Sequence, residues 1–175
     1  MYYFTLLLLP IFILSSCSSD DDNYYVEEEG TLYYDGRSFS LNSARIIEAG
    51  YDNFGLYNVV QLSSGYLSLN GISRADSYIN LKIYNDIHTS FSGGYRFDDP
   101  LHRIVDFDYY ENVQTTNGYV DSYSFRLGYN DVDHNGNIFL NNFSAGYIDT
   151  EFYFRDRNGK ELRGYYTGRF EKAYY

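Results

Sequence analysis

The sequence predicts an all-β protein: an antiparallel meander of about ten strands closed as a barrel, with a two-sheet β-sandwich as the alternative. Three observations lead to this prediction. Apolar and polar residues alternate with a period of two along much of the chain, turn-forming pairs separate the alternating segments, and no convincing stretch of ten or more residues shows helical spacing. Closure into a barrel would remove exposed sheet edges, which favours it over the sandwich.

The alternation is clearest in residues 78–84, where the odd positions are apolar and the even positions are polar or amphipathic. Residues 105–109 and 123–129 show the same pattern, which is typical of antiparallel strands with one buried face. The predicted strands cover residues 31–34, 38–42, 44–50, 57–63, 77–84, 93–97, 103–110, 119–129, 137–147 and 149–155, the last paired with 161–172.

Asn-Gly and Asp-Gly pairs lie between these segments, and both tolerate positive φ at the two central positions of a tight hairpin. They are Asp35-Gly36, Asn117-Gly118, Asn135-Gly136 and Asn158-Gly159. Residues 98–100 form a predicted loop, because Pro100 cannot donate a hydrogen bond to a strand neighbour and restricts Asp99.

The aromatic content and net charge of the chain limit the classes of function that it can have. Aromatic residues make up 21% of the chain, with 23 Tyr and 13 Phe, which is far more aromatic surface than a disordered chain carries. The net charge of −11 and the scatter of the 13 basic residues argue against electrostatic binding to nucleic acid or to acidic lipid head groups. No cofactor is implied.

The N-terminal segment predicts export. Residues 1–16 carry no charge, and the apolar run at 6–14 is too short to span a membrane, for which about 20 apolar residues are needed. Leu14-Ser15-Ser16-Cys17 then resembles the lipobox of bacterial lipoproteins. That resemblance implies a signal peptide over 1–16, cleavage before Cys17, and lipid, including palmitate, on Cys17. Because this is the only cysteine, a disulfide is excluded.

Residues 17–30 form a predicted acidic tether that precedes a single β domain at 31–175. The tether contains Asp20-Asp21-Asp22 and Glu27-Glu28-Glu29, and like charges keep such a segment extended. It also resembles the surface-export signal of Bacteroidetes lipoproteins. The expected location is therefore the outer membrane with the protein facing the cell surface, and retention on the periplasmic side is the alternative.

Two further segments carry a family resemblance. Residues 32–41, followed by Gly50-Tyr51, resemble the opening of small uncharacterised β-rich lipoproteins of Bacteroidetes, and residues 156–168 are similar to their closing hairpin. The resemblance implies a calycin-like barrel or a sandwich, and it assigns no function. Cys17 is the only residue whose role it carries over.

The sequence does not predict an enzyme. The histidines, His88, His102 and His134, lie in or near predicted loops without ligand spacing, and neither a nucleophile elbow nor a phosphate loop occurs. Scattered carboxylates could pair as a glycosidase requires, but an acidic surface produces such pairs by chance.

Residues 131–137 are the sharpest local motif. Asp131, Asp133 and Asn135 place oxygens at alternate positions before Gly136, which resembles the start of a calcium loop. The twelfth position of such a loop would fall on Asn142, so the bidentate carboxylate is missing. We therefore predict a hairpin turn on Asn135-Gly136 that does not hold calcium tightly, with a weak calcium site as the alternative.

Tyrosine gives the remaining candidate. Adjacent pairs such as Tyr109-Tyr110 and Tyr165-Tyr166 must point one ring to each face of a strand. Exposed rings on a β-face stack on sugars, whereas buried rings only fill the fold. Two functions follow: a module that binds glycans or small apolar molecules, or a structural or interaction protein of the outer membrane without a small ligand. Exposed tyrosines around a concavity would favour the first, and dispersed or interior rings the second.

Overall fold

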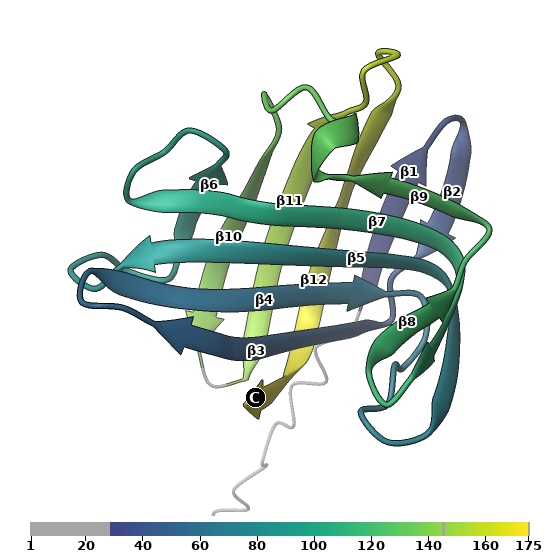
Figure 1. Ribbon diagram of the computed structural model, residues 1–175, viewed down its shortest axis with the longest axis horizontal. Helices are drawn as coiled ribbons and strands as arrows, with labels where there is room; N and C mark the ends of the chain where they lie inside the picture. The colour runs from purple at the N-terminus through teal and green to yellow at the C-terminus, as the bar shows by residue number, and fades with distance from the viewer. Residues whose placement is uncertain (1–28, 145, 175) are drawn as a thin grey trace, which may run out of the picture.

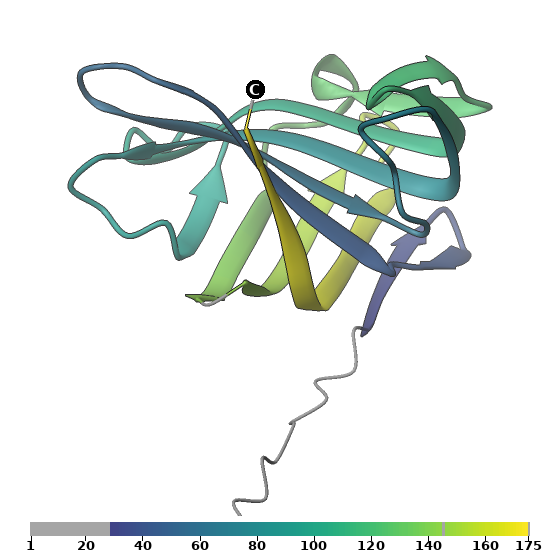
Figure 2. The same ribbon diagram turned by 90° about the horizontal axis from the view of Figure 1, so that it is seen from below.

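The computed structural model describes residues 29–144 and 146–174, which form twelve β-strands and one short 3₁₀ helix (Figures 1 and 2). The elements are β1 (Glu29–Tyr34), β2 (Arg37–Ser40), β3 (Ser43–Tyr51), β4 (Gly55–Ser63), β5 (Ile72–Asp86), β6 (Gly93–Arg96), β7 (His102–Thr116), β8 (Tyr119–Ser122), β9 (Phe125–Gly128), η1 (Tyr129–Asp131), β10 (Asn137–Ser144), β11 (Tyr147–Arg155) and β12 (Glu161–Tyr174). The first strand thus begins two residues inside the predicted tether.

Eight strands close a barrel in the order β3-β4-β5-β7-β6-β10-β11-β12, with β12 returning to β3. The predicted all-β, calycin-like barrel is therefore confirmed. The barrel is flattened into two layers. Figure 1 shows β3, β4, β5 and β7 running across the front, and β10, β11, β12 and β1 crossing behind them.

Two of the strand pairings are parallel, in contrast to the predicted antiparallel meander. The end of β12 pairs with β3 in parallel, from Phe170 opposite Ala44 to Tyr174 opposite Glu48. β6 also meets β7 in parallel, at Arg96 and Arg103. The first arises because the β1–β2 hairpin occupies the same edge of β12 earlier along the strand, so the chain enters β3 in the direction of β12. The barrel is mixed.

Four strands lie outside the closed circuit. The β1–β2 hairpin extends the sheet beyond β12, and β8 and β9 both pair with β7. The predicted single strand at 119–129 is divided because Asn112 of β7 takes a φ of 48° and locally breaks the ladder. The Asn112 side-chain amide donates to the Ser124 hydroxyl at 2.8 Å, which holds the break between β8 and β9.

The turns follow the sequence signals with one exception. Asp35-Gly36 and Asn117-Gly118 have positive φ at both positions, as two-residue hairpins require. The Asn158-Gly159 turn also joins paired strands, β11 and β12. The predicted hairpin on Asn135-Gly136 is wrong: β9 pairs with β7, whereas β10 pairs with β6 and β11. Residues 132–136 instead connect η1 with β10, and Val132 forms an isolated β-bridge with Asp156.

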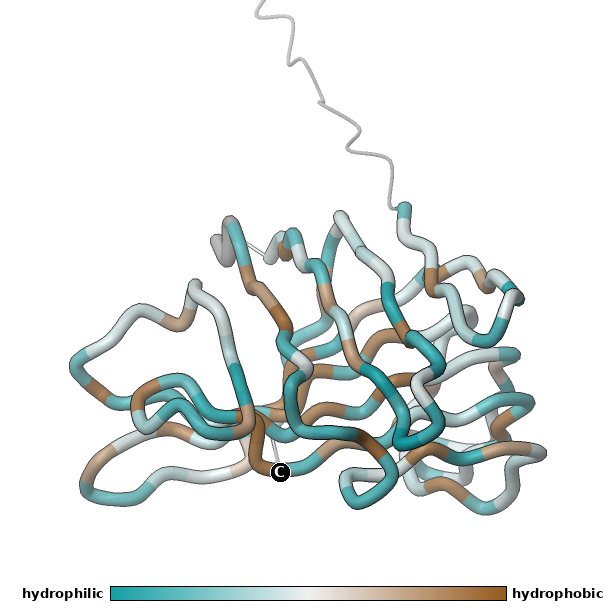
Figure 3. Tube along the Cα trace, turned by 90° about the horizontal axis from the view of Figure 1, so that it is seen from above, coloured by the Kyte–Doolittle hydropathy of each residue, from teal (hydrophilic) through white to brown (hydrophobic). Residues whose placement is uncertain are grey.

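The barrel interior is filled by apolar and aromatic side chains, and Figure 3 shows hydrophobic and hydrophilic residues alternating along the strands. Its largest fully buried rings are Tyr95, Tyr109, Tyr166, Phe107 and Phe154. A second, smaller cluster contains Tyr78 and Tyr110. Tyr109 and Tyr110 therefore enter different clusters, as their adjacency predicts, although both are buried.

Candidate functional site

The outer face of the rear layer carries two rows of side chains that cross β1, β12, β11, β10 and β6. The cross-strand register defines both rows. We call the first the arginine row: Tyr33, Arg163, Tyr153, Asn137 and Arg96. We call the second the glutamate row: Thr31, Tyr165, Glu151, Phe139 and Gly94. In each row a charged residue lies between two aromatic residues.

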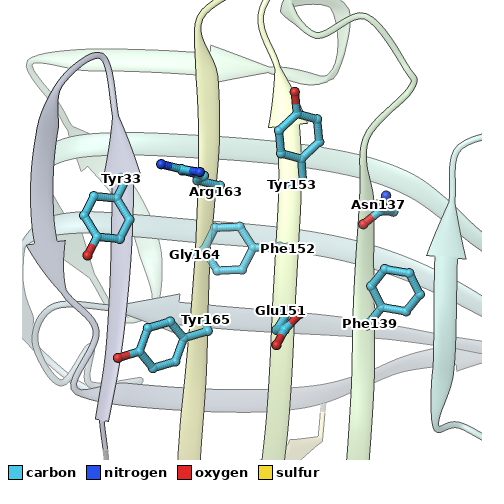
Figure 4. A pocket seen from close by; sticks show the side chains of 9 residues that line it. All are labelled: Tyr33, Asn137, Phe139, Glu151, Phe152, Tyr153, Arg163, Gly164 and Tyr165. Carbon is cyan, nitrogen blue, oxygen red and sulfur yellow. The ribbon is translucent and has the colours of Figure 1, made fainter.

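The two rows enclose an open groove of about 480 Å³ (Figure 4). It is lined by Tyr33, Asn137, Phe139, Glu151, Phe152, Tyr153, Arg163, Gly164 and Tyr165. Tyr33, Phe139 and Tyr165 are 46%, 41% and 38% exposed, so their rings remain accessible although they lie on a sheet. The groove therefore offers ring faces from three strands to one ligand.

Two glycines allow the close packing beneath these rings. A Cβ on Gly164 would lie 2.3 Å from the Thr31 carbonyl oxygen and 2.6 Å from the Phe152 ring. Gly164 and Phe152 alternate with the outward side chains, so it is their main chain that reaches the groove floor. On β6, a Cβ on Gly94 would meet the Phe139 ring at 2.8 Å, so the ring lies across the bare backbone.

Most polar groups of the groove are not engaged by the protein. Among the described residues, no hydrogen bond reaches the hydroxyls of Tyr33 and Tyr165, or the side chains of Asn137 and Glu151. The Arg163 guanidinium lies over the Tyr33 ring, 5.8 Å from its centroid. These groups retain their capacity to bond a ligand.

Tyr153 is the exception within the groove. Its hydroxyl donates to Glu161 Oε1 at 3.0 Å and accepts from Arg155 Nη2 at 2.7 Å. Both partners are about half exposed. This pairing fixes the Tyr153 ring at one side of the groove, and the Arg155 guanidinium lies over the ring, 5.9 Å from its centroid.

A second polar cluster joins two buried carboxylates to the β1–β2 hairpin, and the sequence did not predict it. Arg37 forms two hydrogen bonds with the buried Glu111 carboxylate, which also accepts from the Tyr109 hydroxyl at 3.0 Å. The Tyr34 hydroxyl donates to the buried Asp156 carboxylate at 3.1 Å. Burial, reinforced by these carboxylates, raises the pKa of both phenols.

The two buried carboxylates stabilise local structure. The Asp156 carboxylate also accepts from the backbone N–H groups of Asn158 and Lys160, each at 2.8 Å, and so organises the β11–β12 turn. Glu111 ties the β1–β2 hairpin to β7 through Arg37. Their hydrogen-bonding capacity is taken up by the fold, in contrast to that of Glu151 in the groove.

The carboxylates of the predicted calcium motif accept hydrogen bonds from nearby backbone N–H groups. The Asp131 carboxylate accepts from the Gly128 N–H at 2.8 Å, and the Asp133 carboxylate accepts from the Asn135 N–H at 3.1 Å. His134 takes the positive φ, 58°, that was expected at the Asn-Gly pair, and stacks on Phe97. Within residues 29–144 and 146–174, no group of three or more His, Cys, Asp or Glu side chains is arranged to hold a metal ion.

The remaining predicted residues do not assemble into a site. His102 lies at the start of β7, where Nε2 is 3.0 Å from the Thr89 hydroxyl, and His88 lies in the loop after β5. Cys17, the predicted lipidation site, lies outside the described residues. None of the helical structure in the described part of the chain is long and apolar enough to cross a membrane.

Fold and groove together define an all-β barrel with an aromatic groove on its outer face. Comparison with protein-family models, with curated proteins and with solved structures found no match to this chain.

The groove residues were only partly accessible to sequence reasoning. The adjacent Tyr165-Tyr166 pair predicted one exposed ring, and Tyr165 is that ring. Pairing Tyr33 with Arg163, and Tyr153 with Arg163, required the registers on both sides of β12. The turn at Asn158-Gly159 sets the register between β11 and β12, so it was the available signal, whereas Asp35-Gly36 sets only the register between β1 and β2.

Proposed function

We propose that this chain is a lipid-anchored protein of the outer membrane whose barrel binds glycans in the aromatic groove. The observation that carries the proposal is the groove itself: exposed rings surround a concavity in which Tyr33, Asn137, Glu151 and Tyr165 keep unengaged polar groups. This is the arrangement that favoured a binding module over an interaction protein.

The groove chemistry matches that of a sugar. A pyranose presents a C–H face that packs on an aromatic ring, and hydroxyls at its edge that need both donors and acceptors. Glu151 and Asn137 supply acceptors, whereas Arg163 and the tyrosine hydroxyls supply donors. The binding would therefore combine ring stacking with directed hydrogen bonds.

The spacing of the rings suits an oligosaccharide. Tyr33 and Tyr153 lie two strands apart in the arginine row, and Tyr165 and Phe139 lie two strands apart in the glutamate row. Neighbouring strands are about 4.8 Å apart, so each aromatic pair is separated by roughly 10 Å along the sheet. The expected ligand lies across the strands and contacts more than one ring.

Glycan screening of the purified mature lipoprotein in detergent tests this proposal. The double variant Tyr165→Ala, Phe139→Ala should bind any glycan that the wild-type protein captures at least ten-fold more weakly. Tyr119→Ala is the matched control, because Tyr119 is 70% exposed on β8, outside the groove. Undiminished binding by the double variant, or the absence of any bound glycan, would overturn the proposal.

The lipid anchor is tested separately. In the native host, Cys17→Ala should abolish labelling by palmitate and release the protein from membranes. Protease added to intact cells should digest the wild-type protein if it faces the cell surface. Unchanged labelling would contradict the anchor, and full protection from protease would place the protein on the periplasmic side.

An interaction protein without a small ligand is the second candidate, and an apolar patch on the β3–β4, β5–β6 and β6–β7 loops favours it. Phe54, Ile87 and Leu101 are 70%, 50% and 48% exposed. Their loops are joined, because the Ile87 N–H donates to the Phe54 carbonyl at 3.0 Å and the Asp86 N–H donates to the Leu101 carbonyl at 2.9 Å.

The two candidates differ in which surface matters. If the chain is an interaction protein, Phe54→Ser with Ile87→Ser should abolish co-purification of an envelope partner while leaving glycan binding unchanged. If the groove is the functional surface, the double variant at Tyr165 and Phe139 should show the defect instead. Comparing the two double variants in the same cells distinguishes the candidates.

A further inference from the structure

The arginine row carries cations that the protein leaves available. Arg37, Arg45, Arg126, Arg155, Lys160 and Lys172 each lie within 4.0 Å of a carboxylate. In residues 29–144 and 146–174, neither Arg163 nor Arg96 has a carboxylate at that distance. Of these two, Arg163 lines the open aromatic groove, and Arg96 lies at the end of the same row, beyond the residues that line the groove.

The geometry of the row suits an extended anionic ligand. Arg163 on β12 and Arg96 on β6 are separated by β11 and β10, with Tyr153 and Asn137 between them. Three strand spacings place the two positions on the order of 14 Å apart along the sheet. One oligosaccharide that crosses the strands could therefore present an acidic group to each.

Arg163 is also held in place before any ligand binds. Its guanidinium lies over the Tyr33 ring, a contact that restricts the side chain without using its hydrogen-bond donors. A planar guanidinium binds a carboxylate or a sulfate through two parallel hydrogen bonds. The Arg163 guanidinium is thus already positioned to bind an anion in the groove.

From these contacts we infer that the groove selects an acidic glycan, one that carries uronate or sulfate groups, and that these groups bind along the arginine row. The inference rests on the proposed function and names its substrate class. Glu151 lies in the glutamate row, on β11, diagonally across from Arg163. There its carboxylate accepts hydrogen bonds from hydroxyls of the sugar. The groove thereby orients the ligand, with its acidic edge toward Arg163 and its hydroxyl edge toward Glu151.

Titration calorimetry of the mature lipoprotein in detergent tests this orientation. The probes are hexagalacturonate, the same oligomer with its carboxyl groups reduced to alcohols, and a sulfated hexasaccharide from heparin. The wild-type protein should bind at least one acidic probe ten-fold or more tightly than the reduced oligomer. Raising the salt concentration should weaken binding of the acidic probe and leave binding of the reduced oligomer unchanged.

Three variants sharpen the test. Arg163→Gln should lower the affinity for the acidic probe at least ten-fold and the affinity for the reduced oligomer less than three-fold. Glu151→Gln should raise the affinity for the acidic probe, because a like charge is removed. It should lower the affinity for the reduced oligomer. Arg169→Gln is the matched control: Arg169 also lies over a tyrosine on a neighbouring strand, Tyr147, but outside the groove, and this variant should leave both affinities unchanged.

The outcomes separate the inference from the proposed function. Equal affinity for acidic and reduced oligomers, lost in the double variant at Tyr165 and Phe139, would overturn the acidic selectivity and keep a glycan-binding groove. The same would follow if Arg163→Gln and Arg169→Gln had equal effects. Failure of the protein to bind any glycan in the screen would overturn both. A preference for the sulfated probe over the uronate probe supports the inference and shows that the groove accepts a sulfated acidic glycan.

Discussion

Tyr33 and Tyr34 are neighbours on β1, and Tyr165 and Tyr166 are neighbours on β12, yet the two members of each pair lie in different environments. Tyr34 and Tyr166 point into the barrel and are 3% and 0% exposed, whereas Tyr33 and Tyr165 face outward and are 46% and 38% exposed. The hydroxyls differ as well. Tyr34 donates to Asp156 and Tyr166 donates to the Arg169 carbonyl at 2.8 Å, but no hydrogen bond within the described structure reaches the outward pair.

The difference shows how one residue type serves both the fold and the candidate site. A buried hydroxyl costs free energy unless it is hydrogen-bonded, so every inward tyrosine of the main core must reach a partner. Tyr95 and Tyr109 follow the same rule, with the Phe91 carbonyl and Glu111 as acceptors. Outward tyrosines have no such requirement, and a hydroxyl left without a protein partner is free for a ligand.

The largest expected difference is in stability between adjacent alanine variants. Tyr166→Ala should lower the free energy of unfolding by about 3–5 kcal/mol, because a fully buried ring leaves a cavity in the barrel. Tyr165→Ala should lower it by less than about 1 kcal/mol, since its ring is exposed. Urea denaturation followed by circular dichroism measures both. Similar losses would mean that the outward ring is part of the core.

The second test compares a buried carboxylate with an exposed one. Glu111→Gln should destabilise the protein by about 1–3 kcal/mol, because it weakens the bonds from Arg37 and Tyr109 in a buried setting. Glu161→Gln removes an ion pair whose two side chains are 47% and 44% exposed, and should cost less than about 1 kcal/mol. Equal costs in chemical denaturation would contradict the distinction between the buried Glu111 carboxylate and the exposed Glu161 carboxylate.

Alkaline pH tests the inward tyrosines directly. Burial, with the Glu111 carboxylate nearby, raises the pKa of Tyr109 above its ordinary value of 10.0, and burial raises that of Tyr95. The unfolded chain therefore releases these protons first as the pH rises. Stability should be fully present below about pH 10 and decrease above it, by up to about 1.4 kcal/mol per pH unit for each such phenol.

The variants Tyr109→Phe and Tyr95→Phe each remove one of these groups. In each, the free energy of unfolding should decrease less steeply between about pH 10 and pH 11.5 than in the wild-type protein. Urea midpoints measured across that interval give the slopes. Slopes that match the wild-type value in both variants would mean that these two phenols do not contribute to the alkaline transition.

The sequence predicted the all-β fold because strands and tight turns are specified by local patterns of residues. Alternation located most strands within three residues of their observed ends, although β5 begins five residues before and β7 ends six residues after the predicted bounds. Asp35-Gly36 and Asn117-Gly118 adopt the turn conformation that their chemistry favours. The parallel contact between β12 and β3 was not predictable, because it depends on where the β1–β2 hairpin ends along β12. Asn135-Gly136 misled because a tight-turn signal does not reveal which strands it connects.

The candidate site was predictable only as a residue type. Adjacent tyrosines on a strand must face opposite sides, so an exposed set was expected from the pattern alone. Which exposed rings meet depends on pairing among strands that are far apart in sequence: Glu151 lies opposite Tyr165 and Phe139, and Arg163 lies opposite Tyr33 and Tyr153. The interior cluster of Arg37, Glu111 and Tyr109 also requires the closed barrel, since 74 residues separate Arg37 from Glu111.

The smallest expected effect is the most specific test of the comparison, because it removes one oxygen atom from each member of a neighbouring pair. Tyr34→Phe should destabilise the protein by about 1 kcal/mol, since the buried Asp156 carboxylate loses a donor. Tyr33→Phe should change the free energy of unfolding by less than about 0.5 kcal/mol, because the described structure gives its hydroxyl no partner to lose. If Tyr33 instead proves as costly as Tyr34, its hydroxyl supports the fold. The donor that we assign to a bound sugar would then already be in use.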